Sequence, residues 1–230
     1  MHTIIASLLQ FLSLVFLAVG ALLPIVDPLG GAPIYLAMTS TLTSEQRARM
    51  AQAVALNSFL LLMASAMIGA YVLDFFGLSI PAVQVAGGIV VAAIGWQLLN
   101  SADSATALDH ASPPPATPQA LRERAFYPMT MPLTVGPGSI SVAITLGANP
   151  ASGLRATLNA AVAHAIGIVI VSLSVYLCYR YAEQILRRIG KIGTGIFIRL
   201  SAFILLCIGV QICWNGTRSL VATGFRIPLS

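Results

Sequence analysis

The chain has 230 residues, of which 57% are hydrophobic and only 8% are charged. Because soluble domains carry about a quarter charged residues, this composition excludes a soluble globular protein and indicates an integral membrane protein. We interpret the net charge of +5 as an unequal distribution of Lys and Arg between the loops on the two sides of a membrane. It is not a sign of nucleic-acid binding, and no nucleic-acid partner is expected.

The first apolar segment runs from Ile4 to Met38 and contains an interruption at residues 24–33, with three prolines, two glycines and Asp27. As one helix it would measure roughly 50 Å, whereas the hydrocarbon core is about 30 Å thick. We therefore expect two half-helices that meet at the interruption. Since lipid offers no hydrogen bonds, such a break marks either a packing kink or a binding site. No Lys or Arg precedes the segment and no small-residue cleavage site follows it before the interruption, so we expect a retained span rather than a secretory signal.

Two further spans complete the first half of the chain. A polar loop follows residue 38, and Thr43 or Ser44 is expected to cap the next helix. The second span covers about 50–73 and carries Asn57, and the third covers about 81–99 and carries Gln97, which we expect to serve packing. Residues 101–124 read as a Pro-rich linker that is extended or disordered.

The second half begins with another Pro- and Gly-broken segment at residues 126–141. A fifth span of about 155–179 carries His164, a basic loop follows at 183–191, and a sixth span covers about 194–214. The cysteines lie in or beside apolar spans without metal-ligand spacing, so they are read as packing residues. No metal and no cofactor are expected.

The halves resemble each other. Ala53-Val54-Ala55 matches Ala161-Val162-Ala163 at an offset of 108, and Ile94-Gly95-Trp96-Gln97 matches Ile208-Gly209-Val210-Gln211 at an offset of 114. We predict an all-α membrane protein of six segments: a three-helix repeat at 1–100, a cytoplasmic linker at 101–125, and a second three-helix repeat at 126–230. Because three is odd, the second repeat is inverted, as in many secondary transporters. Basic residues gather after spans one, three and five, which predicts both termini outside.

The breaks offer complementary groups to a ligand. A helix that restarts presents unpaired N–H groups, and a helix that stops presents carbonyl oxygens, so two crossing breaks suit a zwitterionic amino acid. Asp27 can bind an ammonium, hold a cation or carry a proton, or it can cap the restarting helix. The alternative is that the breaks are packing kinks. The predicted substrate-binding residues are Asp27, Pro28, Gly30, Gly31, Asn57, Thr134, Gly136, Gly138 and Ser139, and the predicted ion- or proton-coupling residues are Asp27 and His164.

Four stretches closely resemble the MarC family of bacterial and archaeal inner-membrane proteins: PIVDPLG at 24–30, VAGGI at 85–89, FYPMTMPLTVGPGSI at 126–140 and RLSAFILLCIGVQ at 199–211. The resemblance implies six transmembrane segments and, as in members called SnatA, transport of small neutral amino acids such as glycine and alanine. The family usually has Asn-Pro where this chain has Asp27-Pro28, so the role of that position in substrate range or coupling is left open.

We therefore expect an inner-membrane secondary transporter of small neutral amino acids that works by alternating access and is coupled to H⁺ or Na⁺. The alternatives are a passive channel, an exporter of other small solutes, and a membrane enzyme or regulatory protein. An enzyme would need a matched pair of polar groups, for which Asp27 and His164 are the deep titratable candidates. Lipid is the expected surrounding, and the sequence does not indicate an oligomeric state.

Overall fold

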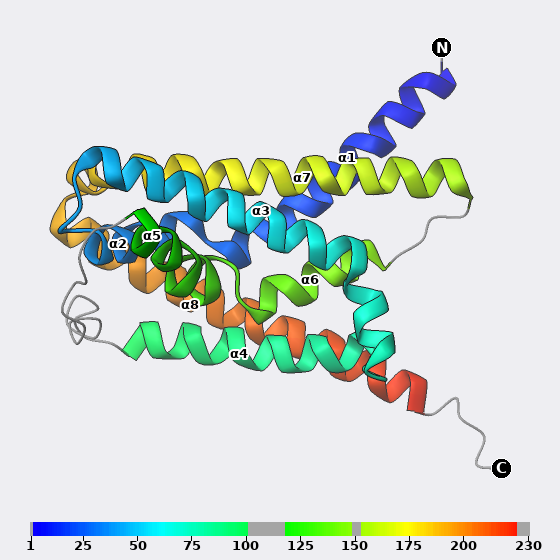
Figure 1. The fold of residues 1–230 in the computed structure, drawn as a ribbon. Coiled ribbons are helices and arrows are strands. Elements are labelled where there is room, and N and C mark those ends of the chain that lie inside the picture. Colours follow the sequence, from blue (N-terminus) through cyan, green and yellow to red (C-terminus); the bar gives the residue numbers. More distant parts are fainter. Residues whose placement is uncertain (1, 101–117, 149–152, 225–230) are drawn as a thin grey trace.

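A computed structural model describes residues 2–100, 118–148 and 153–224, and every regular element in these ranges is a helix (Figure 1). No strand occurs in these ranges. In chain order the elements are α1 (His2–Val26), α2 (Pro28–Met38), α3 (Ser44–Phe75), α4 (Ile80–Asn100), α5 (Pro118–Arg124), the irregular helical segment η1 (Ala125–Thr134), α6 (Pro137–Gly147), α7 (Leu154–Arg180) and α8 (Ala182–Gly224).

Five stretches of helix are long and apolar enough to cross a membrane. They are Ser7–Leu36, Ser44–Phe75, Ile80–Asn100, Arg155–Arg180 and Gly193–Ala222. Large apolar side chains such as Phe16 and Trp96 are exposed on them, as lipid-facing positions require. The multi-span prediction is confirmed at this level. The fourth predicted segment is not among these five stretches. It consists of η1 followed by α6, and α6 has 11 residues and is too short to span a membrane alone.

The first break is narrower than predicted. Asp27 alone lies outside the helices, with φ of 40°, between the end of α1 and the start of α2. Backbone bonds continue on both sides of it, because Asp27 N–H donates to the Leu23 carbonyl and Gly31 N–H donates to the Asp27 carbonyl, each at 2.9 Å. Pro24 and Pro33 lie inside helices. A membrane helix tolerates a proline when neighbouring helices cover the freed backbone groups.

The second break extends over more of the backbone. Tyr127 and Met131 have non-helical dihedral angles within η1, and Val135 and Gly136 are extended. Pro137 then occupies the first position of α6, where a missing N–H costs nothing.

The start of α1 and the end of α8 lie at one end of the bundle, and the loop after α2, the helix α5 and the start of α8 lie at the other (Figure 1). Arg47 and Glu183 form an ion pair of 3.4 Å that joins α3 to α8 at this second end, which we call the loop end. Thr43 caps α3 in a capping box with Gln46, which confirms one of the two predicted caps. Most of the predicted cytoplasmic arginines belong to segments at the loop end.

Two predicted loops are helical instead. Residues 118–124 of the predicted linker form α5, and residues 183–189 belong to α8, whose backbone departs from helical geometry at Gly190 with φ of 75°. The Ala-Leu-Arg-Glu-Arg run and the Ile-Leu-Arg-Arg run are polar enough to suggest loops, but their residues are good helix formers. Residues 101–117 of the linker lie outside the described residues.

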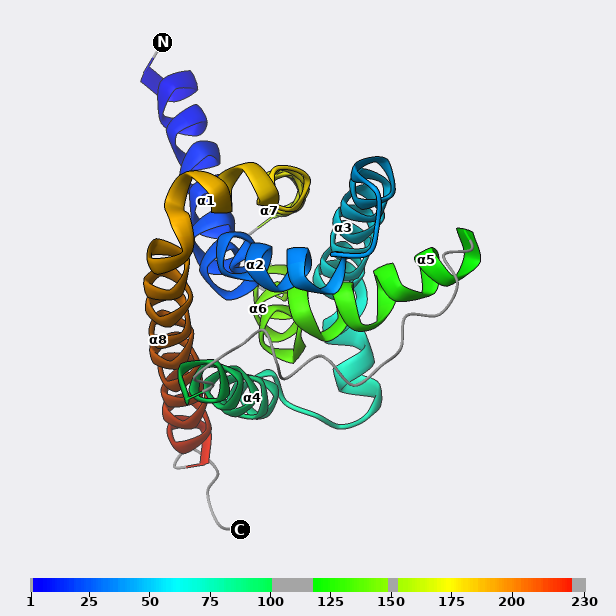
Figure 2. The ribbon, with the colours of Figure 1, turned by 90° about the vertical axis from the view of Figure 1, so that its left-hand side faces the viewer.

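The core lies between α1, α2, α3, η1, α6 and α7, with α6 near the middle of the bundle when it is viewed along its length (Figure 2). The rings of Tyr35 and Tyr179 stack with centroids 4.5 Å apart and are buried in this core.

The helices α4 and α8 pack against each other at glycines. A Cβ atom at Gly209 would lie 2.7 Å from the Ala92 Cα and 2.8 Å from the Gly88 carbonyl oxygen, so the two backbones are in direct contact. Small residues that let helices approach this closely are a common means of packing in membranes.

Candidate functional site

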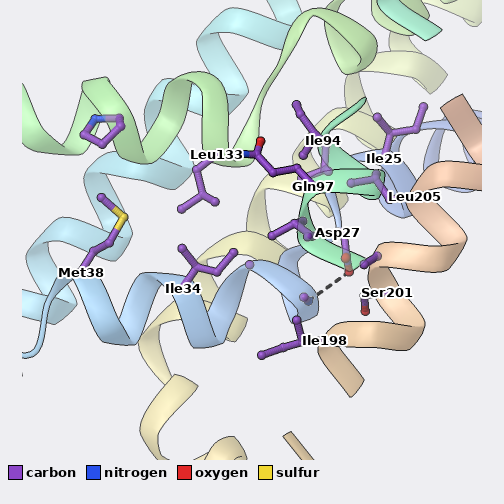
Figure 3. A pocket seen from close by; sticks show the side chains of 16 residues that line it. Ile25, Asp27, Ile34, Met38, Ile94, Gln97, Leu133, Ile198, Ser201 and Leu205 are labelled. Carbon is purple, nitrogen blue, oxygen red and sulfur yellow. Dashed lines mark hydrogen bonds between the residues drawn. The ribbon is translucent and has the colours of Figure 1, made fainter. Parts of the chain in front are cut away.

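A cavity of about 370 Å³ lies beside the first break, and we call it the Asp27 cavity (Figure 3). Its walls are mostly aliphatic, and its polar side chains are those of Asp27, Gln97 and Ser201. None of its lining residues is basic. The lining residues are Ile25, Val26, Asp27, Gly30, Gly31, Ile34, Met38, Ile94, Gln97, Leu98, Pro128, Leu133, Ile198, Ser201, Ala202 and Leu205.

Asp27 is held by the helix that it begins. Its Oδ1 accepts a hydrogen bond of 3.0 Å from the Gly30 N–H, so the carboxylate caps the N-terminus of α2 (Figure 3). Ser201 of α8 lines the same cavity (Figure 3). Within the described ranges no ion pair involves Asp27. A half-buried carboxylate in an apolar cavity without a cationic partner is able to receive a cation.

A smaller cavity of about 50 Å³ lies at the second break, and we call it the Gly136 cavity. Gly136 precedes α6, whose N-terminus has no side-chain cap. The two cavities share four lining residues and therefore adjoin. These are Ile25, Ile94, Leu133 and Leu205. The cavity that contains the Asp27 carboxylate thus adjoins the cavity at the uncapped N-terminus of α6.

The predicted hydroxyls of the second break are already engaged. Thr134 Oγ1 donates to the Met129 carbonyl at 2.8 Å and lies 2.9 Å from Tyr179 Oη, while Ser139 Oγ donates to the Gly136 carbonyl at 3.0 Å. Both side chains are almost fully buried. They fix the backbone of the break, and their positions at the edge of the Gly136 cavity leave contact with a ligand open.

The predicted site residues divide among several places. Asp27, Gly30 and Gly31 line the Asp27 cavity, and four others line the Gly136 cavity, namely Thr134, Gly136, Gly138 and Ser139. Pro28 is buried at the first position of α2.

Asn57 and His164 lie elsewhere. Asn57 is half-buried and lines neither cavity, and His164 lines a third cavity of about 230 Å³ between α3, α6 and α7. Asp27 and His164 line different cavities, and within the described parts of the chain no hydrogen bond joins them. The acid–base pair that an enzyme would need is therefore not formed by these two residues.

Two polar residues of the Asp27 cavity were not among the predicted site residues. Gln97 was predicted to serve packing, and Ser201 received no role, yet both line the cavity. A signal existed for Ser201, because it lies with Ile198, Ala202 and Leu205 on one face of α8 at helical spacing. In an apolar helix, however, that spacing marks every buried face and does not single out a ligand.

The comparisons with known proteins agree with this arrangement of apolar helices. A family model described as "MarC family integral membrane protein" matches residues 12–221. The chain is 31% identical over 225 residues to "UPF0056 inner membrane protein MarC" of Escherichia coli O1:K1 / APEC, and the match covers 94% of this chain and 99% of that protein. The protein of the same name from Escherichia coli strain K12 matches with the same identity and coverage. No solved structure matches. The chain therefore belongs to the MarC family of integral membrane proteins, and with relatives that are inner membrane proteins and five candidate spans of its own it is a multi-pass protein of the inner membrane.

Proposed function

We propose that this protein is a secondary transporter that carries small neutral amino acids, of the glycine and alanine class, across the inner membrane. The observation that carries the proposal is the adjoining pair of cavities, with the Asp27 carboxylate in one and the uncapped α6 N-terminus in the other. A zwitterion bound across them would place its ammonium at Asp27 and its carboxylate at α6. The N-terminus of α2 is less available to a substrate carboxylate, because Asp27 itself caps it.

The proposed architecture is two inverted three-helix repeats with six membrane segments, of which the first and fourth are broken. Gly95 supports it. A Cβ atom there would lie 2.9 Å from both the Ala202 carbonyl oxygen and the Leu206 Cα. Moved back by the offset of 114, Ala202 and Leu206 become the two residues of α4 that Gly209 meets in the same way. Two glycines in equivalent sequence positions therefore make equivalent contacts, as a pseudo-two-fold axis requires.

The lengths of α2 and α6 support the same architecture. Each has 11 residues and begins with a proline, Pro28 or Pro137, directly after a break. In inverted-repeat transporters the substrate lies between broken helices in corresponding positions, near the middle of the membrane.

Uptake into proteoliposomes tests the function. Labelled glycine and alanine are supplied to vesicles that hold the purified protein, with and without an imposed H⁺ or Na⁺ gradient. We expect saturable uptake that one gradient increases, because Asp27 is a membrane carboxylate able to take part in coupling. Uptake that is proportional to concentration and indifferent to both gradients would indicate a passive channel instead.

Asp27→Asn is the informative variant, and Asp74→Asn is its matched control. Asp74 is an exposed carboxylate near the end of α3 and lines neither cavity. We expect Asp27→Asn to lower uptake at least tenfold or to remove its gradient dependence, and Asp74→Asn to leave both unchanged. If folded Asp27→Asn protein transports with the same gradient dependence as the wild type, the coupling role of Asp27 is wrong.

A further inference from the structure

The two short helices that follow the breaks have the same length but different surroundings. Between α2 and α8 lies the Asp27 cavity of about 370 Å³, whereas the Gly136 cavity, which α4 and α6 line, has about 50 Å³. The larger cavity includes Met38 and Leu98, which stand at or near the last turns of α2 and α4. It therefore lies toward the loop end of the bundle.

On the other side, α4 and α6 are in close contact. A Cβ atom at Gly87 would lie 2.9 Å from Ser141 Oγ and 3.2 Å from the Pro137 carbonyl oxygen, so only a glycine fits there without a shift. Nearby, Gln84 Nε2 donates a hydrogen bond of 3.0 Å to Thr145 Oγ1. The helices α4 and α6 are therefore held together here by a close contact at Gly87 and by a hydrogen bond between side chains.

The closed contact and the open cavity occupy corresponding places in the sequence. Adding the offset of 114 to Gln84, Gly87 and Val91 of α4 leads to Ile198, Ser201 and Leu205 of α8. All three residues on α8 line the Asp27 cavity. The residues that close one side are therefore the counterparts of residues that border the opening on the other side.

We propose that the α4–α6 contact is the closed gate of a transport path, and that the structure is the state open toward the loop end. This inference rests on the proposed function as a transporter. Transport requires the opposite state, in which α4 separates from α6 while α8 closes on α2. Because the positive-inside rule places the loop end in the cytoplasm, the gate faces the outside of the cell. Gln84, Gly87, Ser141 and Thr145 then line the outer entrance when it opens.

A reversible crosslink tests the gate. In a chain whose Cys178, Cys207 and Cys213 are replaced by serine, cysteines are introduced as Gly87→Cys and Ser141→Cys. The Cβ atom of residue 87 would lie 3.3 Å from that of Ser141, close to the mean of about 3.8 Å found in disulfides. We expect oxidation to reduce uptake by the double variant to less than about a tenth of its own uptake under reducing conditions, and a reducing agent to restore it. Each single variant is compared with itself in the same way, and its uptake is expected to be the same with the oxidant as under reducing conditions. Full uptake with the disulfide formed would overturn the gate and leave the proposed function intact.

Labelling with a membrane-impermeant maleimide gives a second test that needs neither the double variant nor a substrate. Ser201→Cys is expected to react only with reagent added at the loop end, because Ser201 lines the open cavity. Ser141 is buried in this structure, and Ser141→Cys is expected to react only with reagent added at the opposite end. Labelling of both positions from the same side, or no labelling of position 141 from either side, would overturn the gate. The expected labelling without any uptake of glycine or alanine would support the gate and count against the proposed substrate alone.

Discussion

The contact between α4 and α8 makes the sharpest prediction about stability. In Gly209→Ala the new Cβ atom would lie 2.7 Å from the Ala92 Cα, roughly 0.7 Å closer than ordinary contact at 3.4 Å. The nearest atoms belong to the backbone of α4, so no side chain can turn away to make room. The helices must separate, and the contacts along their shared face are weakened.

Overpacking of this kind typically costs about 1–3 kcal/mol. For a chain of this length that corresponds to a fall in melting temperature of about 2–12 °C. The measurement is thermal unfolding of purified protein in detergent, followed by circular dichroism. The melting temperature of Gly95→Ala is expected to fall by a similar amount, because a Cβ atom at residue 95 also meets backbone atoms at 2.9 Å.

Gly20→Ala is the matched control. Gly20 lies on α1, and a Cβ atom added to it would meet no neighbouring atom within 4 Å, so the substitution introduces no clash. It is expected to leave the melting temperature unchanged or to raise it, because alanine favours the helix. The reasoning would be refuted if the melting temperature of Gly209→Ala were within about 1 °C of the wild-type value. It would also be refuted if Gly20→Ala lowered the melting temperature as much as Gly209→Ala does.

Three further predictions concern single side chains. Tyr179→Phe removes the hydroxyl that lies 2.9 Å from Thr134 Oγ1. Because hydrogen bonds between membrane helices contribute about 0.6–1.7 kcal/mol, the melting temperature should fall by about 1–7 °C. An unchanged melting temperature would mean that this hydrogen bond adds nothing to stability. Thr43→Ala removes the capping box of α3 and should cost about 1 kcal/mol, seen as a loss of about 2–4 °C in the same melt; no loss would show that the helix start is held by tertiary contacts alone. Asp27→Asn should keep its melting temperature, because an amide oxygen can still cap α2, so a large loss of stability would show that the charge is structural.

The class of the protein and the places of its spans followed from composition and hydropathy alone. Charged residues are so few, and apolar runs so long, that only membrane helices satisfy their backbone groups in lipid. The capping role of Thr43 was also readable, because a cap depends on neighbours three residues away. The two breaks were located for the same local reason, since proline and glycine act on the backbone where they stand.

The extent of each break was decided by tertiary structure. Pro24 and Pro33 remain within helices, and only Asp27 leaves helical geometry at the first break, whereas the second break continues from Tyr127 to Gly136. Proline content was similar in the two stretches. Local sequence therefore did not distinguish the two breaks, and their different extents appear only in the folded backbone.

The composition of the site was likewise decided by packing. Asp27 was recognisable from the sequence as an unusual residue, but Gln97 and Ser201, which line the same cavity, belong to helices distant in the sequence. His164, which was predicted to be a coupling residue, lines a different cavity. Helical periodicity tells which residues share a face of one helix, and it does not tell which face meets which partner. That choice depends on the angle and the register at which helices cross, and here these are set by close contacts at glycines such as Gly209. The sequence alone therefore determined a membrane protein with broken segments, and only the packing of its helices decided which polar groups meet at the breaks.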